Sequence, residues 1–321
     1  MRALLIVNPN ATSTTAAGRD LLAHALESRV RLTVEHTTHR GHAAELARAA
    51  HDDGFGSVIV HGGDGTVNEV VNGLLGTPRP ASMKSVPVGP IPTIAVVPGG
   101  SANVFARSLG IAPDPVDATN QLIDLLSART RRRIGLAHCD NRWFTFNAGM
   151  GLDAEVCDAV DAGRKNGEPV TPARYVRSSI SAFFRAKRAE PALTVHLPGR
   201  DPVPGVHYAF VSNSSPWTFL DTRPVHTNPG TSFDGGLGIF AMTSTRILPS
   251  LRVVRQLLAA GAGPKSKILL REDDLESLTI ESSRPIGLQM DGDYLGLRSH
   301  VTFTSVPEAL EVYAPAPLPP Q

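Results

Sequence analysis

A glycine-rich segment at residues 61–70 carries the residue types that bind phosphate. It reads His61-Gly62-Gly63-Asp64-Gly65-Thr66-Val67-Asn68-Glu69-Val70 and directly follows a short apolar run at residues 57–60. Glycines let backbone N–H groups approach an anion closely, and a helix starting here would direct its positive N-terminus to the same place. Asp64 adds a carboxylate that can hold a cation beside the phosphate. The segment therefore predicts a nucleotide phosphate site.

A second glycine turn repeats this design one strand and helix later. It reads Pro98-Gly99-Gly100-Ser101-Ala102-Asn103 and follows the apolar run 93–97. A single turn of this kind also fits a plain tight turn with a solvated Asp64 and a helix capped by Thr66. Two such turns, each between an apolar run and a helical pattern, favour a phosphate cradle over that simpler interpretation.

The elements expected around these turns form an α/β domain over residues 1–133. Apolar runs predict strands at residues 3–7, 31–35, 57–60 and 93–97. Periodic patterns between and after them predict helices at residues 14–28, 42–53, 66–75, 102–109 and 115–128. Alternation of strand and helix is typical of a parallel sheet covered by helices. Ligands of such sheets bind at the carboxyl ends of the strands, so the loops after all four strands are expected at one crevice.

The remainder of the chain shows a different hydrophobic pattern, which predicts an antiparallel β domain over residues 134–308. Short alternating runs occur at residues 143–147, 193–197, 207–212, 237–242, 275–280, 286–290 and 300–304. Helices are expected to interrupt them at residues 172–189 and 247–260. Residues 309–321 are expected to hold a terminal strand that returns to the first domain, followed by a proline-rich tail.

Composition limits the classes of binding partner and the cellular compartment that fit this protein. The charges of the 31 Lys and Arg residues nearly cancel those of the 30 Asp and Glu residues, so the chain has no overall positive charge that would indicate binding to nucleic acid. Two cysteines are too few for a disulfide framework. The apolar start of the chain is too short for a leader or an anchor, and no window reaches the ~20 apolar residues of a spanning helix. A cytoplasmic protein without a transmembrane segment is expected, and its oligomeric state is left open.

Four motifs, taken in order, resemble the diacylglycerol kinase catalytic family, which includes bacterial lipid kinases and is related to sphingosine and ceramide kinases. They are Asn8-Pro9, the glycine segment 62–69, residues 98–107, and Asn147-Ala148-Gly149-Met150-Gly151-Leu152-Asp153-Ala154. The resemblance implies a Rossmann-like first domain of the kind shared with NAD kinase and a C-terminal β-sandwich. It also implies ATP as phosphate donor, Mg²⁺ as cofactor and a lipid hydroxyl as acceptor.

Carried over by position, the resemblance assigns residues to the nucleotide. They are Asn8, Pro9, Asn10, Ala11, Thr12, Thr37, Gly62, Gly63, Asp64, Gly65, Thr66, Val67, Asn68, Glu69 and Ser101. Asp64 is the residue expected to orient the metal. Thr38 is an alternative to Thr37, since one residue separates the two registers. The first loop departs from the family's usual Asn-Pro-x-Ser-Gly.

The segment Gln289-Met290-Asp291-Gly292-Asp293 resembles the family's Asp-Gly-Glu motif. The final carboxylate of that motif is taken as the base that deprotonates the lipid hydroxyl, which makes Asp293 the expected catalytic base beside Asp64. Asp-Gly between apolar runs is also a hairpin-turn signal. Both interpretations are compatible.

A magnesium site of a different kind is implied by the segment at residues 231–237. In bacterial members of the family the corresponding aspartate and neighbouring carbonyls hold a structural Mg²⁺, which by position are Asp234 with the carbonyls of Thr231 and Gly236. One carboxylate with carbonyls is a weak hard-cation site, so a plain Asp-Gly turn is the alternative.

Three further expectations concern membrane contact and alternative functions. Residues 174–188 combine apolar positions at helical spacing with interleaved cations, which suits peripheral contact with the inner face of a membrane, where a lipid substrate is presented. A packing helix with a solvated basic rim is the alternative. Val104 stands where many family members have an acid, so a binding protein without catalysis is an alternative function. NAD kinase is another, although its Gly-Ser-Thr-Ala-Tyr type segment is missing here.

Overall fold

The computed structural model describes residues 1–12, 14–78, 90–151, 190–220, 222–259 and 263–317. The chain forms two compact units. The first comprises Met1–Leu136, Asn141–Trp143 and Pro307–Gln321, and the second comprises Ala137–Asp140 and Phe144–Val306. Strands β5 (Arg132–Cys139) and β16 (Asp293–Val312) contribute residues to both units.

The first unit is built on parallel strands. These are β1 (Arg2–Val7), β2 (Arg31–His36), β3 (Ser57–Gly62) and β4 (Thr93–Pro98), in the order β4-β3-β1-β2. The end of β16 adds to β4, where Val312 pairs in parallel with Ile94. Strands β3 and β4 are buried along their whole length, as expected for parallel strands covered on both faces.

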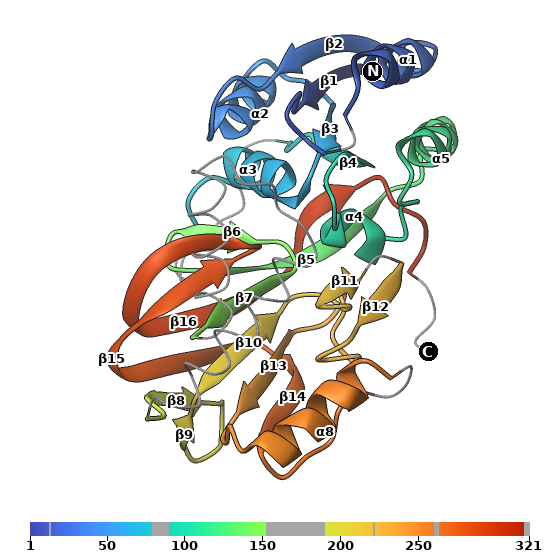
Figure 1. The fold of residues 1–321 in the computed structure, drawn as a ribbon. Coiled ribbons are helices and arrows are strands. Elements are labelled where there is room, and N and C mark those ends of the chain that lie inside the picture. Colours follow the sequence, from blue (N-terminus) through green and yellow to red (C-terminus); the bar gives the residue numbers. More distant parts are fainter. Residues whose placement is uncertain (13, 79–89, 152–189, 221, 260–262, 318–321) are drawn as a thin grey trace. The chain divides into compact units, whose positions relative to one another are not determined.

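Five helices accompany this sheet within residues 1–136 (Figure 1). They are α1 (Ala16–Glu27), α2 (His42–Asp52), α3 (Asp64–Leu75), α4 (Val104–Ser108) and α5 (Pro115–Ala128). N-cap side chains hold the starts of α1 and α5, since Thr15 Oγ1 accepts from Gly18 N and Asp114 accepts from two backbone nitrogens of α5. Helices α2 and α3 approach closely because Gly73 faces the backbone of Ala44, where a Cβ atom would not fit.

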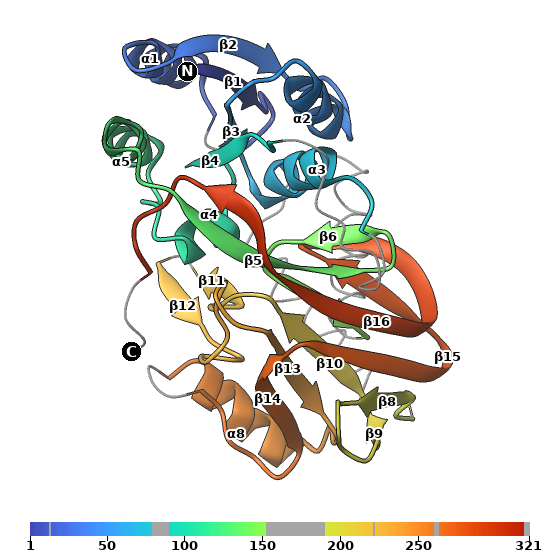
Figure 2. The ribbon, with the colours of Figure 1, turned by 180° about the vertical axis from the view of Figure 1, so that it is seen from behind.

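The second unit is an antiparallel β structure in the order β14-β13-β10-β7-β15-β16. Its strands are β6 (Arg142–Phe144), shared with the first unit, then β7 (Asn147–Met150), β8 (Leu193–His196), β9 (Val203–Val206), β10 (Tyr208–Ser212), β13 (Leu237–Met242), β14 (Leu269–Leu275) and β15 (Ser277–Met290). A separate hairpin joins β11 (Thr218–Leu220) to β12 (Arg223–Val225). Figure 2 shows β13 beside β14, with helix α8 (Ile247–Leu257) next to them.

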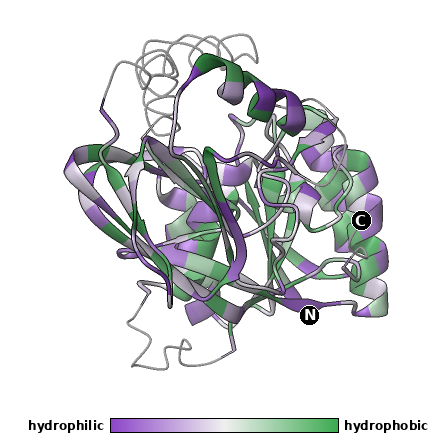
Figure 3. Ribbon diagram, turned by 90° about the horizontal axis from the view of Figure 1, so that it is seen from below, coloured by the Kyte–Doolittle hydropathy of each residue, from purple (hydrophilic) through white to green (hydrophobic). Residues whose placement is uncertain are grey.

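The core of the second unit is aliphatic and contains a few aromatic rings. Buried side chains from several strands form it, among them Phe144, Met150, Val211, Ile239, Leu288 and Phe303. The hydropathy-coloured ribbon in Figure 3 shows hydrophobic and hydrophilic residues alternating along the strands. The predicted combination of an α/β region with an antiparallel β region is confirmed.

Three details of the predicted elements are wrong or lie outside the described residues. The single strand expected at residues 143–147 is divided between β6 and β7, because Thr145, Phe146 and Asn147 donate their N–H groups to the Asp291 carboxylate instead of a neighbouring strand. The runs at 275–280 and 286–290 are not two separate strands, because residues 277–280 and 286–290 both belong to β15, whose register shifts between Glu281 and Ile286, and Leu275 ends β14. The helix expected at residues 172–189 lies outside the described residues.

Candidate phosphate-binding and catalytic site

Four loops of the first unit leave its parallel strands at the same edge. Val7 pairs with His61, and His61 pairs with Val97, so β1, β3 and β4 end in register. The following residues are Asn8, Gly63 and Gly99, and Thr37 follows β2 in the same way. Loops at the carboxyl ends of parallel strands form the ligand site of open α/β sheets.

The two glycine turns lie directly against each other. Gly99 N donates to Gly62 O at 2.9 Å. A Cβ atom on Gly100 would stand 2.6 Å from the Cα of Gly63, and one on Gly99 would stand 3.0 Å from the Cα of Gly62. The contact between the turns therefore excludes a side chain at Gly100 and crowds one at Gly99. Gly65 differs, because it is exposed and a Cβ atom there would meet nothing within 4 Å.

Asp64 joins the first turn to the helix that follows the second. Its Oδ2 accepts from Val104 N and its Oδ1 from Phe105 N, both at 3.0 Å. A carboxylate oxygen has two lone pairs, so each oxygen can also meet a metal-bound water. The donor set thus fits Mg²⁺ held indirectly, while the contacts that the structure shows belong to the start of α4.

Asn103 closes the second turn, a role that the sequence pattern did not indicate. Its Oδ1 accepts from Gly100 N at 2.9 Å and its Nδ2 donates to Gly100 O at 2.7 Å. The residue has a φ of 49°, in the left-handed region where asparagine is favoured among non-glycine residues. A positive φ cannot be read from the neighbouring residue types alone.

The first loop is held by Asn8. Its Nδ2 donates to Thr66 Oγ1 at 3.0 Å, and its Oδ1 accepts from Asn10 N at 3.0 Å. Pro9, Asn10 and Thr12 are exposed, and Ala11 is half-buried. Exposed polar groups at this edge of the sheet are available to a bound nucleotide.

Several residues assigned to the nucleotide serve the protein itself in the structure. Glu69 accepts from Gly41 N at 2.9 Å and from Ala43 N at 3.3 Å, so its carboxylate caps α2. Asn68 is buried and accepts from Arg142 Nη2 at 2.7 Å. Val67 is buried in α3.

The remaining assigned residues lie at the edge of the sheet. Thr37 is half-buried and its backbone N–H donates to Val7 O. Ser101 is exposed in the second turn. The structure therefore brings Thr37, Ser101, the first loop and the glycine turns to one edge of the sheet. The side chains of Val67, Asn68 and Glu69 instead make contacts within the protein.

His61 is a buried polar residue beneath the glycine turn for which the sequence indicated no role. Its Nε2 lies 3.2 Å from Thr14 Oγ1, and its Nδ1 lies 3.2 Å from Val97 O. Since a carbonyl only accepts, the Nδ1–H tautomer donates to Val97, and Nε2 can accept from Thr14. Burial lowers the pKa of His61, the bond to Val97 opposes this change, and Arg19 adds to it. The ring therefore favours the neutral form.

In the second unit, Asp291 and Gly292 form the turn between β15 and β16, as the hairpin interpretation predicted. Their φ values are 49° and 84°, which is the conformation of a tight two-residue hairpin. The Asp291 carboxylate accepts from Thr145 N at 2.6 Å, Thr145 Oγ1 at 2.7 Å, Phe146 N at 3.0 Å and Asn147 N at 3.2 Å. Burial raises the pKa of Asp291, and these donors oppose that change.

Asp293, the expected base, opens β16 and pairs with Met290 across the turn. It is partly exposed, whereas Asp291 is buried. A second polar link supports the same hairpin, since Gln289 Nε2 donates to Asn147 Oδ1 at 3.1 Å and Gly292 N donates to Gln289 Oε1 at 2.9 Å. The two aspartates of the motif thus occupy different environments.

The loop expected to hold a structural Mg²⁺ lies against β14. Thr231 Oγ1 donates to Asp273 Oδ1 at 2.6 Å, and Gly236 N donates to Asp274 Oδ1 at 2.8 Å. Asp234 is exposed in the same loop. Within the described ranges, no group of three or more His, Cys, Asp and Glu residues could hold a metal ion. A site made of one carboxylate and carbonyls stays a prediction.

Two observations concern the membrane. No helix within the described ranges is both long enough and apolar enough to span a bilayer. The basic segment at residues 174–188 lies outside the described residues.

Comparison with known proteins shows which proteins this chain resembles. Residues 2–134 match the family described as diacylglycerol kinase catalytic domain. The chain is 27% identical to a probable YegS-like lipid kinase of Stenotrophomonas maltophilia (strain K279a), over 94% of this chain and 92% of that protein. It is 34% identical to the diacylglycerol kinase of Bacillus subtilis (strain 168), over 48% of this chain and 47% of that protein.

The fold is shared with a solved structure, described as a putative diacylglycerol kinase from Bacillus anthracis str. Sterne. The TM-score is 0.74 at 21% identity, over 98% of this chain and 97% of that one. The predicted fold class, a Rossmann-like α/β domain followed by an antiparallel β domain, is thereby confirmed, as is the resemblance from which it was named. Over residues 2–134, this chain is therefore similar to the diacylglycerol kinase catalytic domain, as the resemblance in its sequence predicted.

Proposed function

We propose that this protein is a lipid kinase that transfers the γ-phosphoryl group of Mg·ATP to a lipid hydroxyl. The observation that carries the proposal is the contact between the two glycine turns at the carboxyl ends of β3 and β4, with Asp64 joining them. Such an edge offers backbone N–H groups and a carboxylate to a triphosphate and its metal. The names of the related proteins support a lipid as acceptor.

In the proposed reaction, the bond between the γ-phosphorus and the bridging oxygen of ADP breaks, and a bond to the lipid oxygen forms. Asp293 accepts the hydroxyl proton. The glycine turns and the first loop hold the phosphate chain, and Asp64 is the residue that would hold Mg²⁺ beside it. Bound Mg²⁺ would neutralise the charge on the phosphate oxygens, and catalysis of this type depends chiefly on positioning and charge stabilisation.

The test is incubation of the purified protein with labelled ATP and vesicles of a mixed lipid extract, followed by separation of the lipids. A labelled lipid is the expected product, and mass spectrometry then identifies the acceptor. A parallel reaction with NAD in place of lipid tests the NAD kinase alternative. No labelling in either reaction, with ATP still raising the melting temperature, would overturn the proposal.

A binding protein without catalysis is the second candidate, and Val104 is the observation that favours it. Many family members carry an acid at this position, whereas the Val104 side chain is apolar and 2% exposed. Asp293 also favours a protein without catalysis, because its side chain is shorter than the glutamate of the family's Asp-Gly-Glu motif and a general base must lie within hydrogen-bond distance of the proton it accepts. The labelling experiment separates the two candidates.

A further inference from the structure

Helix α8 carries two apolar faces, and the second unit covers one of them. Val253 is 2% exposed and belongs to a cluster with Tyr208, Phe210, Phe240 and Met242. Leu257 packs against the same cluster. This face fixes the helix on the strands β10 and β13.

The other apolar face is open to solvent. Its exposed fractions are 44% for Ile247, 73% for Leu248, 58% for Leu251, 46% for Val254 and 41% for Leu258. These positions recur at one, four, seven and eleven residues after the first, which places them on one side of a helix. Contiguous apolar surface of this kind marks an interaction site. We call these five residues the α8 stripe.

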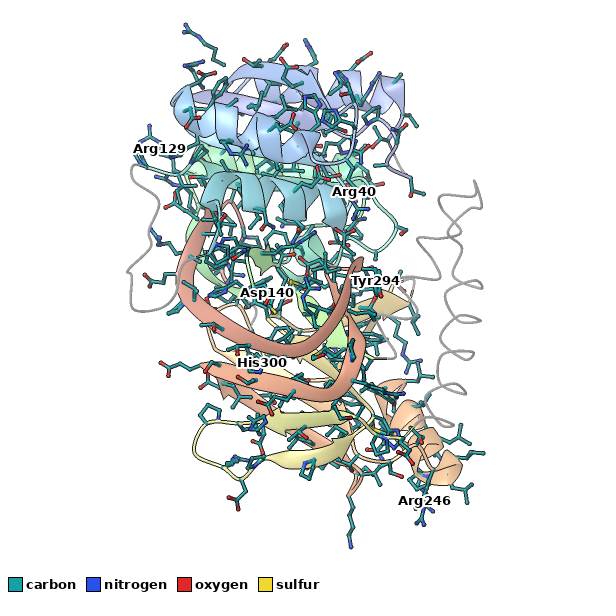
Figure 4. All side chains as sticks on the ribbon, turned by 90° about the vertical axis from the view of Figure 1, so that its left-hand side faces the viewer. Arg40, Arg129, Asp140, Arg246, Tyr294 and His300 are labelled. Carbon is teal, nitrogen blue, oxygen red and sulfur yellow. The ribbon has the colours of Figure 1, made fainter. Side chains whose placement is uncertain are left out.

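Cations are the only charged residues in the part of the sequence that holds the α8 stripe. Residues 235–271 contain Arg246, Arg252, Arg255, Lys265, Lys267 and Arg271, and no Asp or Glu. Arg246 projects from the start of the helix in Figure 4, and residues of both polarities follow one another along α8 in Figure 3. An apolar stripe whose neighbours in the sequence carry only positive charge complements a surface that is apolar inside and anionic outside.

We infer that α8 docks this protein on an anionic lipid bilayer. The α8 stripe would enter the boundary between headgroups and acyl chains, and the arginines would meet lipid phosphates. With 11 residues, α8 suits binding parallel to the surface and is too short to span a bilayer. A second copy of the chain is a poorer occupant, because packing two such stripes together would bring the arginines of α8, Arg252 and Arg255, toward their own counterparts, and α8 itself carries no acid to offset them.

Docking deepens the proposed function, since a lipid kinase must reach its substrate in a membrane, but binding to vesicles needs no phosphoryl transfer. The experiment is therefore co-sedimentation without ATP, using vesicles of phosphatidylglycerol and phosphatidylcholine and, separately, of phosphatidylcholine alone. Binding to the anionic vesicles that weakens as salt rises is expected. A preparation that binds vesicles but labels no lipid would count against the proposed kinase function and would leave the docking inference standing.

The informative variants are the double changes Leu248→Gln with Leu251→Gln and Arg252→Gln with Arg255→Gln. Each is expected to weaken binding about tenfold or more, since apolar insertion and headgroup attraction both contribute. Matched controls are Leu21→Gln on α1, where the leucine is 60% exposed, and Arg48→Gln on α2, where the arginine is exposed. Both controls are expected to bind as the unchanged protein does. Glutamine suits helices, and urea unfolding checks that every variant folds.

Two outcomes would overturn the inference. One is equal binding by the stripe variants and the unchanged protein. The other is found if the unchanged protein sediments as a dimer in analytical ultracentrifugation, the Leu248 and Leu251 double variant sediments as a monomer, and both bind vesicles equally. That result would assign the α8 stripe to contact with a second copy of the chain.

Discussion

The backbone nitrogen of Val104 donates a hydrogen bond to Asp64 Oδ2 at 3.0 Å, across 40 positions of the chain. Phe105 N makes the matching bond to the other carboxylate oxygen. The acid of the first glycine turn thus provides the cap of the helix after the second turn. Because Val104 contributes its N–H group, this link does not depend on the type of side chain at position 104.

Replacement of Asp64 should reveal both of its roles. Asp64→Ala is expected to lower the free energy of unfolding by about 1–2 kcal/mol, the usual cost of losing a helix cap, and to abolish lipid labelling. Asp114 is a matched control, because it caps α5 by the same chemistry. Asp114→Ala should lose similar stability in urea unfolding and keep its labelling activity. Undiminished labelling by Asp64→Ala would contradict the role in phosphoryl transfer.

The contact between the glycine turns predicts opposite effects for two Gly→Ala changes. Gly100→Ala forces a methyl group against Gly63, so both stability and ATP-induced thermal stabilisation should fall. Gly65 lies in α3 with open space beside it, so alanine there should stabilise the unliganded protein by about 0.5–1 kcal/mol. ATP should nevertheless raise its melting temperature less than that of the unchanged protein, since the added methyl group occupies the proposed phosphate side. Thermal scans with and without Mg·ATP measure both quantities.

The two aspartates of the Asp-Gly-Asp turn should separate folding from catalysis. Asp291→Asn replaces an acceptor of four hydrogen bonds and is expected to cost about 3 kcal/mol or more in urea unfolding. Asp293→Asn should unfold close to the unchanged protein, while its labelling rate falls on the order of a hundredfold or more. A stable Asp293→Asn variant that labels lipid at the normal rate would remove Asp293 as the base.

His61 should make stability depend on pH below its ordinary pKa of 6.5. Its folded-state pKa is lowered, so above 6.5 both states are neutral and the residue adds no slope. As the pH falls below 6.5 the unfolded state binds the proton first, and stability decreases until the folded-state pKa is reached, with a slope of at most about 1.4 kcal/mol per pH unit. Denaturant unfolding over a pH series measures this slope.

His61→Gln should show a shallower decline than the unchanged protein below pH 6.5. The decline should not vanish, because burial also lowers the pKa of His138 and of His226. Identical slopes for His61→Gln and the unchanged protein would contradict this account.

Local patterns were sufficient for most elements of the first unit. The predicted helix at residues 115–128 coincides with α5, and the strands at 31–35 and 93–97 are each one residue shorter than β2 and β4. These elements depend on apolar periodicity, caps and glycine turns within a few residues, which a sequence displays directly. The strand at 143–147 was wrong because its N–H groups are bound by Asp291, far along the chain.

Local residue patterns were enough to predict two glycine turns after buried parallel strands and an Asp-Gly turn before a candidate base. The capping of α4 by Asp64, the capping of α2 by Glu69 and the exposed apolar face of α8 become apparent only in the folded chain. A hydrogen bond depends on a partner brought near by folding, and the burial of a helix face depends on what packs against it. Neither quantity is a property of the neighbouring residues in the chain.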